Sequence, residues 1–226
     1  MGEKVSISLV NAKRHLICLA SSCMFVAMTI APALAQSTGY TKLNVKSRVQ
    51  LEVPDDWAIS DAEHRRRIKE FAEKVTGIPT QHTASLSVQS FPAPSRMFVR
   101  VSFLKLEPPI SQADVRKEVQ TDRQQVIRDL AGMWKEESPV MWAGLAKNGV
   151  REVGRATFAV ETLGGQTALV IRYGRTSTVN PAETMRVAQY HIPLGDEKAL
   201  ISLSYIDGDK GAMTAHDRLK TSFVIR

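Results

Sequence analysis

Cysteine is nearly missing from the sequence, and its two copies, Cys18 and Cys23, both lie close to the amino terminus. They fall within a segment that we expect to be removed, so the rest of the chain contains no thiol. This excludes a disulfide framework, a cysteine nucleophile and a cysteine-based metal site. Stability must then come from a hydrophobic core, and the roughly 190 remaining residues are enough to form one in a single domain.

Recognisable catalytic motifs are missing as well. The sequence has no Gly-x-Ser-x-Gly, no phosphate-binding loop and no dinucleotide-binding fingerprint. Beyond the first 35 residues its histidines are His64, His82, His191 and His216, and none of them forms the close pairs that bind zinc. The segment 207–211 lacks most of the acidic ligands of a calcium loop, so we interpret it as a turn. We therefore expect no metal and no other cofactor.

One long apolar run is present, from Leu16 to Leu34, and no later run is long enough to span a membrane. Basic residues precede this run, and it ends in small residues up to Ala35. This arrangement is typical of a secretory signal peptide. We therefore predict that residues 1–35 are removed by cleavage near Ala35 and that the protein is periplasmic or secreted. Two alternatives are a retained membrane anchor and a lipid attached to Cys23.

Positive charge exceeds negative charge by a modest margin. The full chain carries a net charge of +7, and residues 1–35 contribute three basic side chains and one acidic side chain, which leaves +5 for the remainder. This charge suits peripheral contact with an anionic lipid surface, an anionic polysaccharide or an acidic protein. The sequence has no concentrated basic stripe with interleaved aromatic residues, so nucleic acid is not a predicted partner.

The longest basic run contains three consecutive arginines, Arg65, Arg66 and Arg67. It follows the segment 60–63, Ser-Asp-Ala-Glu, which is typical of a helix capping box, so the arginines fall in the first turns of a predicted helix. We take them as candidate residues for binding an anionic ligand. The alternative is an ordinary solvated helix face, because three consecutive residues spread around a helix instead of forming one tight site.

Hydrophobic periodicity predicts a single α+β domain over residues 43–226, after a flexible lead over residues 36–42. Alternating apolar residues predict strands, and apolar residues at helical spacing predict helices. The expected order is strand 45–53, a helix from residue 60 to about 76, strands 84–88 and 97–103, helix 111–137, strands 155–163, 166–172, 185–192 and 199–205, and a short helix 214–223. We expect Gly164-Gly165 to form a tight hairpin turn. This order predicts a largely antiparallel sheet covered by helices.

Two apolar segments are candidate contacts for a partner protein. Phe91 begins a proline-containing loop that is longer and stiffer than a hairpin turn. Met141 and Trp142 lie in an irregular apolar segment that follows the helix expected to end before Pro139. The alternative for this second segment is a loop that packs over the core.

Several short motifs resemble those of one known fold. They are strand 49–53 followed by Pro54-x-x-Trp57, the Gly164-Gly165 hairpin, the paired segments 190–195 and 200–205, and the closing segment 219–223. Together they resemble the PsbP-like α/β/α sandwich, which includes the bacterial DcrB-like envelope proteins. The resemblance implies a sheet between layers of helices, a bacterial envelope setting, and a role in binding or assembly without catalysis. No binding residue of a member is matched.

These observations lead to one main hypothesis and two alternatives. The main hypothesis is an exported, non-enzymatic envelope protein that binds a protein partner or assists assembly, through a sheet edge or through the segments around Phe91, Met141 and Trp142. The first alternative is a protein that binds an anionic ligand at residues 65–67. The second is a hydrolase of an envelope polymer that uses a carboxylate together with His191.

Overall fold

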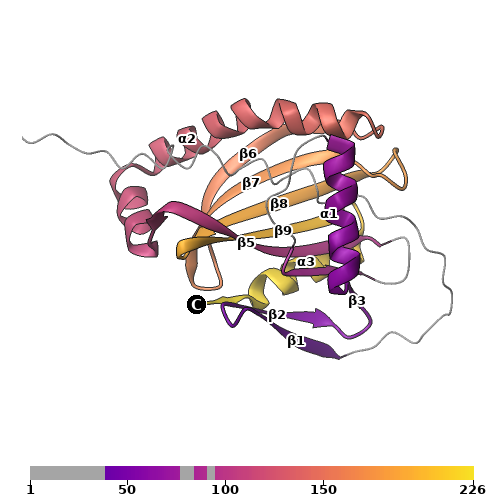
Figure 1. The fold of residues 1–226 in the computed structure, drawn as a ribbon, viewed down its shortest axis with the longest axis horizontal. Helices are drawn as coiled ribbons and strands as arrows, with labels where there is room; N and C mark the ends of the chain where they lie inside the picture. Colours follow the sequence, from indigo (N-terminus) through magenta and orange to yellow (C-terminus); the bar gives the residue numbers. More distant parts are fainter. Residues whose placement is uncertain (1–38, 77–83, 91–94) are drawn as a thin grey trace, which may run out of the picture.

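The computed structural model describes residues 39–76, 84–90 and 95–226, which form two antiparallel sheets and three helices (Figure 1). The large sheet contains, in spatial order, β3 (Ala58–Ile59), β4 (Leu86–Gln89), β5 (Met97–Ile110), β9 (Gly195–Ile206), β8 (Thr184–Pro193), β7 (Gln166–Thr176) and β6 (Glu152–Leu163). The small sheet contains β1 (Tyr40–Val45), β2 (Val49–Pro54) and β10 (Val224–Ile225). The helices are α1 (Ala62–Thr76), α2 (Gln112–Ala146) and α3 (Lys210–Ser222). The expected signal peptide lies outside the described residues.

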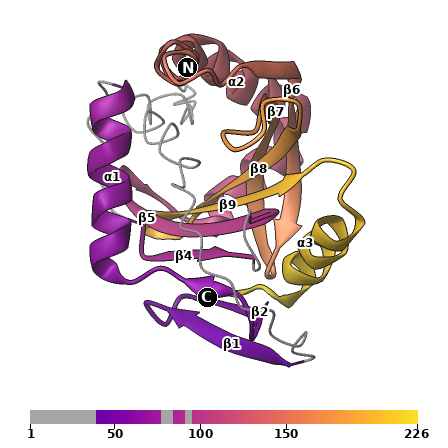
Figure 2. The ribbon, with the colours of Figure 1, turned by 90° about the vertical axis from the view of Figure 1, so that its right-hand side faces the viewer.

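Two hydrophobic layers lie on opposite faces of the large sheet, and Figure 2 shows α2 on one side of the sheet and β2 with α3 on the other. The first layer joins this sheet to β2 and α3, and it includes Leu51, Ala188 and Leu219. The second joins the sheet to α2, and it includes Leu130 and Ile171. The predicted α+β class, with an antiparallel sheet between covering elements, is therefore confirmed.

The first strand differs from the prediction. Residues 45–53 do not form one strand, because β1 and β2 are joined by a tight turn in which Lys46 and Ser47 have φ values of 50° and 56°. Val45 pairs with Val49 across this turn, and both side chains are buried. The apolar alternation therefore continues through the turn and conceals it. β1 also includes residues 40–42, which were expected to belong to the flexible lead.

The long helix α2 extends past the residue expected to end it. Its predicted start is confirmed, since the Ser111 hydroxyl accepts from the Asp114 amide and the Asp114 carboxylate accepts from the Ser111 amide. Pro139 lies inside the helix, whose last turns place Met141 and Leu145 in the core at 5% and 6% exposure. Burying two such side chains contributes about 3–6 kcal/mol, which offsets the roughly 3 kcal/mol cost of an internal proline.

Other element boundaries also differ from the prediction. Asp61 caps α1, because its carboxylate accepts from the His64 amide at 2.6 Å. Asp209 caps α3 in the same way, by accepting from the Ala212 amide at 2.9 Å, so this helix begins about one turn earlier than expected. The Gly164-Gly165 hairpin is confirmed, with φ values of 57° and 83° that suit glycine. Within the described ranges, no helix is long and apolar enough to cross a membrane.

Candidate anion-binding site

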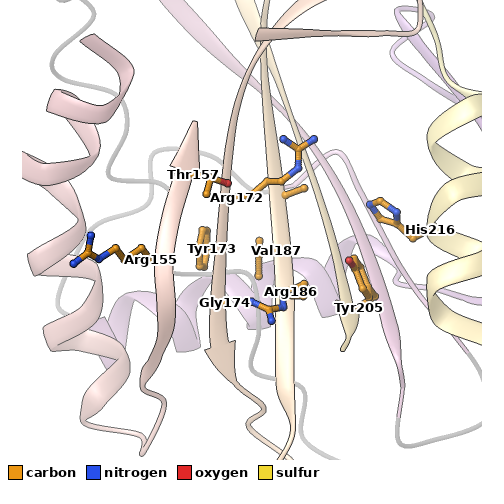
Figure 3. Close-up of a pocket in the computed structure, with 10 residues that line it drawn as sticks. Arg155, Thr157, Arg172, Tyr173, Gly174, Arg186, Val187, Tyr205 and His216 are labelled. Atoms are coloured by element: carbon orange, nitrogen blue, oxygen red, sulfur yellow. The ribbon is translucent and has the colours of Figure 1, made fainter. Parts of the chain in front are cut away.

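A pocket of about 230 Å³ opens on the face of the large sheet that α3 partly covers (Figure 3). It spans β6, β7, β8 and β9 and ends against α3. Its lining residues are Arg155, Thr157, Arg172, Tyr173, Gly174, Arg186, Val187, Ala188, Tyr205 and His216. We call it the arginine pocket, because three of its side chains are arginines from three neighbouring strands.

Strand register brings these residues together. Arg172 of β7 lies between Thr157 of β6 and Ala188 of β8. In the next row, Arg186 of β8 lies between Gly174 of β7 and Tyr205 of β9. Residues directly opposite each other on paired strands point to the same face, so each arginine stands beside small or polar side chains. Arg172 and Arg186 are diagonal neighbours, with Cα atoms roughly 7–8 Å apart in such a pair.

Gly174 is required for the floor of the pocket. A Cβ atom at this position would lie 2.5 Å from the Val153 carbonyl oxygen and 3.2 Å from Nη1 of Arg186. The guanidinium of Arg186 therefore lies over a glycine, as Figure 3 shows. The neighbouring strand β6 has an irregular register between Val153 and Thr157, and such an irregularity bends a strand locally.

Arg172 and Arg186 are held by carboxylates beside the pocket. Nη2 of Arg172 lies 2.6 Å from Oε1 of Glu161, whose other oxygen accepts from Lys220 at 3.0 Å. Nε and Nη2 of Arg186 both contact Oδ2 of Asp207, at 2.8 Å and 2.6 Å. Partial burial opposes ionisation of Glu161, but its bonds to Lys220 and Arg172 outweigh that effect and lower its pKa. These carboxylates fix the guanidinium groups in place.

Arg155 differs from the other two arginines. It is exposed on β6, and among the described residues we find no ion pair for it. Figure 3 shows its side chain extending outward from β6, on the side away from Tyr205 and His216. Arg155 is therefore an exposed positive charge at the rim, and its side chain must turn back over β6 for its donors to reach a ligand in the pocket.

An aromatic pair closes the α3 side of the pocket. The rings of Tyr205 and His216 lie 4.8 Å apart, and Nδ1 of His216 is 3.0 Å from Asp217. Partial burial, followed by the negative charge of Asp207, raises the pKa of Tyr205, so its phenol stays protonated and can donate a hydrogen bond.

An ion-pair network positions α3 next to the pocket. Arg96, at the start of β5, contacts Glu183 at 2.7 Å and the helix cap Asp209 at 2.8 Å. The hydrogen bonds from Arg96 to Glu183 and Asp209 raise the pKa of Arg96. The pKa of Asp209 is lowered by the hydrogen bond from the Ala212 amide and by the one from Arg96. The network thus ties α3 to two strands of the sheet, and this fixes the position of His216.

The arginines singled out from sequence lie elsewhere. Arg65 donates from Nη1 to the Ser60 carbonyl, and Arg66 lies 3.7 Å from Glu70 on the same helix. The charge of Arg67 contributes to lowering the pKa of Asp61, after the larger effect of the His64 amide. None of these three arginines lines the arginine pocket.

Of the residues considered for partner contact, Met141 is buried and Trp142 is half-buried. Met141 is 5% exposed and belongs to the layer between α2 and the sheet. Trp142 is half-buried and packs edge-on against Trp134 and Tyr173, with ring centroids 6.5 Å and 5.6 Å away. Phe91 lies outside the described residues. In this structure Met141 therefore offers little contact area to a partner.

The histidine considered for catalysis lies on the opposite face of the sheet from the pocket. His191 pairs with Leu169 and Leu200, which pack towards α2, and it is only 3% exposed. Burial, followed by the charge of Lys198, lowers its pKa well below the usual value, so it is neutral. Its Nε2 atom is buried and makes no hydrogen bond.

The described part of the chain contains no group of three or more His, Cys, Asp or Glu side chains that could hold a metal ion. The side chains that line the arginine pocket offer hydrogen bonds and positive charge. Guanidinium groups provide donors, and the hydroxyls of Thr157 and Tyr205 can both donate and accept.

Comparison with known proteins identifies only distant structural similarity. No protein-family model matches the chain, and no curated protein matches it. A solved structure from Bacteroides thetaiotaomicron has 8% identity and a TM-score of 0.41 over 80% of this chain, which spans only 46% of that protein. The cyanobacterial PsbP of Synechocystis has 10% identity and a TM-score of 0.46, with 88% of this chain and 98% of that chain covered.

LpqN of Mycobacterium tuberculosis, a protein involved in cell envelope biogenesis, has 17% identity and a TM-score of 0.39, with 83% of this chain and 90% of that chain covered. The Synechocystis protein belongs to the group that the sequence motifs resemble. Similarity at this level concerns the fold and transfers no residue role or partner to this chain.

Proposed function

We propose that this protein is an exported, non-enzymatic binding protein that holds an anionic group of its ligand in the arginine pocket. One observation carries the proposal: three arginines from neighbouring strands line one small pocket, and one of them, at the rim, has no ion pair among the described residues. An arginine at a pocket is a suitable partner for carboxylate or phosphate, because its planar donors match their oxygens.

The fixed geometry of two arginines supports this role. Glu161 and Asp207 hold Arg172 and Arg186, so a ligand would not have to order these side chains when it binds. Immobilising a long side chain costs roughly 0.5–1.5 kcal/mol, and preorganisation avoids that cost. Arg155 remains free to turn from the rim over a bound anion.

An NMR titration tests the proposal. Sodium acetate and inorganic phosphate are added to the ¹⁵N-labelled protein at constant ionic strength, and amide shifts are followed. We expect saturable shifts around Thr157, Gly174 and Tyr205 for at least one of these anions. In Arg155→Gln the affinity should fall about tenfold or more, since a hydrogen bond to a charged group contributes roughly 1.5–3 kcal/mol.

The matched control is Arg66→Gln, which also removes one positive charge but lies on α1. It should leave the affinity unchanged. Saturable shifts confined to residues 62–70 and lost in Arg66→Gln would instead place the anion site on α1. The absence of any saturable shift around the pocket would contradict the proposal.

A protein partner is a second candidate, and the edge of the large sheet favours it. β6 is the last strand in the sheet order and has 12 residues, so one side of it is without a neighbouring strand in the described structure. An extended segment of another protein could add to such an edge by main-chain hydrogen bonds. Arg123 of α2 already occupies one acceptor of this edge, the Val160 carbonyl, at 2.8 Å.

A further inference from the structure

We infer that the ligand group held in the arginine pocket is a carboxylated sugar ring, such as one uronate residue of an acidic polysaccharide. The inference rests on the proposed function and specifies the chemical class of its ligand. It is carried by the size of the pocket, its net charge and its mixture of donors and acceptors.

The pocket is the size of one ring. Pockets that enclose a drug-sized molecule have roughly 300–1,000 Å³. The arginine pocket has about 230 Å³, so it can accept one sugar residue while the rest of a longer molecule stays outside. Its lining includes the small residues Gly174 and Ala188 beside Thr157, which leave room between the arginines.

The charges around the pocket favour a single negative charge. Arg155, Arg172, Arg186 and Lys220 provide four positive charges, and Glu161, Asp207 and Asp217 provide three negative ones, which leaves +1. A carboxylate compensates this charge. A phosphate dianion would exceed it and would face the Glu161 and Asp207 carboxylates, which repel it.

The hydrogen-bonding groups favour a ligand with hydroxyls. An anion alone accepts hydrogen bonds and donates none, so the hydroxyl oxygens of Thr157 and Tyr205 would receive no hydrogen bond from it. Sugar hydroxyls both donate and accept, so they can bond in either direction to the hydroxyl of Thr157 and to the protonated phenol of Tyr205. A neutral sugar would leave the charge of Arg155 unused. A carboxylated sugar uses both kinds of group.

Isothermal titration calorimetry with four probes tests the inference: methyl β-D-glucuronide, methyl β-D-glucoside, acetate and inorganic phosphate. We expect the glucuronide to bind at least tenfold more tightly than each of the other three. Tyr205→Phe and Thr157→Val each remove one hydroxyl and should weaken glucuronide binding about three- to tenfold while acetate binding stays unchanged. Arg155→Gln should weaken both, and Arg66→Gln should weaken neither.

The outcomes separate the two proposals. If acetate or phosphate binds at the pocket but the glucuronide binds no better than acetate, the sugar inference is overturned and the anion site stands. Phosphate binding more tightly than the glucuronide would also overturn it. If none of the four probes binds, both proposals fail. Equal weakening of acetate and glucuronide in Tyr205→Phe would mean that the tyrosine shapes the pocket without touching a sugar hydroxyl, and would count against the inference.

Discussion

Replacing Glu137 with glutamine should stabilise the protein at pH 8 and change its stability little at pH 5. Glu137 lies on α2 next to Glu136. Burial raises the pKa of its carboxyl group from 4.5 to about 7. The positive charge of Lys198 opposes this shift, and the negative charge of Glu136 adds to it. The Oε2 atom of Glu137 is buried without a hydrogen bond. The folded state therefore keeps a proton that the unfolded chain releases at lower pH.

The sign of the pH dependence follows from this difference. Between about pH 4.5 and pH 7 the folded state binds more protons, so the free energy of unfolding falls as the pH rises and levels off above pH 7. The pKa interval sets an upper limit of about 3 kcal/mol. Because the side chain is only half-buried, solvent screening reduces the expected effect to about 1 kcal/mol. Glutamine has nearly the same shape and removes the ionisation altogether.

Urea denaturation followed by tryptophan fluorescence at pH 5, 6, 7 and 8 measures this effect. The difference in unfolding free energy between Glu137→Gln and the parent protein should grow across the series and reach about 1 kcal/mol at pH 8. Glu152→Gln is the matched control, since Glu152 is exposed on β6 and does not contribute to the pKa of Glu137. A difference that is constant with pH, or a glutamine variant less stable than the parent at pH 8, would refute the reasoning.

Two further predictions concern the sheet. Gly174→Ala should destabilise the protein by about 1–3 kcal/mol and weaken anion binding, because the new Cβ atom meets the Val153 carbonyl and displaces Arg186. An unchanged urea midpoint would show that the arginine pocket is not tightly packed at Gly174. A photo-crosslinking residue at Thr162, on the edge strand β6, should capture a reproducible partner in intact cells, whereas one at the exposed position Arg116 on α2 should not. Equal capture at both positions would contradict docking along β6.

Local signals in the sequence predicted most of the fold. The Gly164-Gly165 turn, the cap at Ser111 and the alternation over residues 97–103 of β5 each reflect a local pattern in the sequence. The two wrong predictions, of one continuous first strand and of a helix that ends before Pro139, have a common cause in tertiary packing. The turn at Lys46 and Ser47 has no glycine to mark it, and α2 continues through Pro139 because the turns beyond it bury Met141 and Leu145.

The candidate site could not be predicted in the same way. Arg155, Arg172 and Arg186 come from three different strands, and no spacing in the sequence relates them. Only the register of β6, β7 and β8 brings them to one face, and a shift by one residue would send each to the other face. The consecutive arginines on α1 gave a stronger signal in sequence, yet the helix spreads them apart.

The sequence by itself determined the fold class, the lack of cysteine beyond residue 35 and the prediction of export, since composition and periodicity are properties of the chain alone. The tertiary structure alone decided which charges meet. It paired Arg172 with Glu161 and Arg186 with Asp207. It also placed His191 on the face of the sheet that packs against α2, opposite the face that carries the arginine pocket. The reason is physical: contacts between strands depend on their register and on which face of the sheet each side chain occupies, and these are fixed only when the sheet assembles.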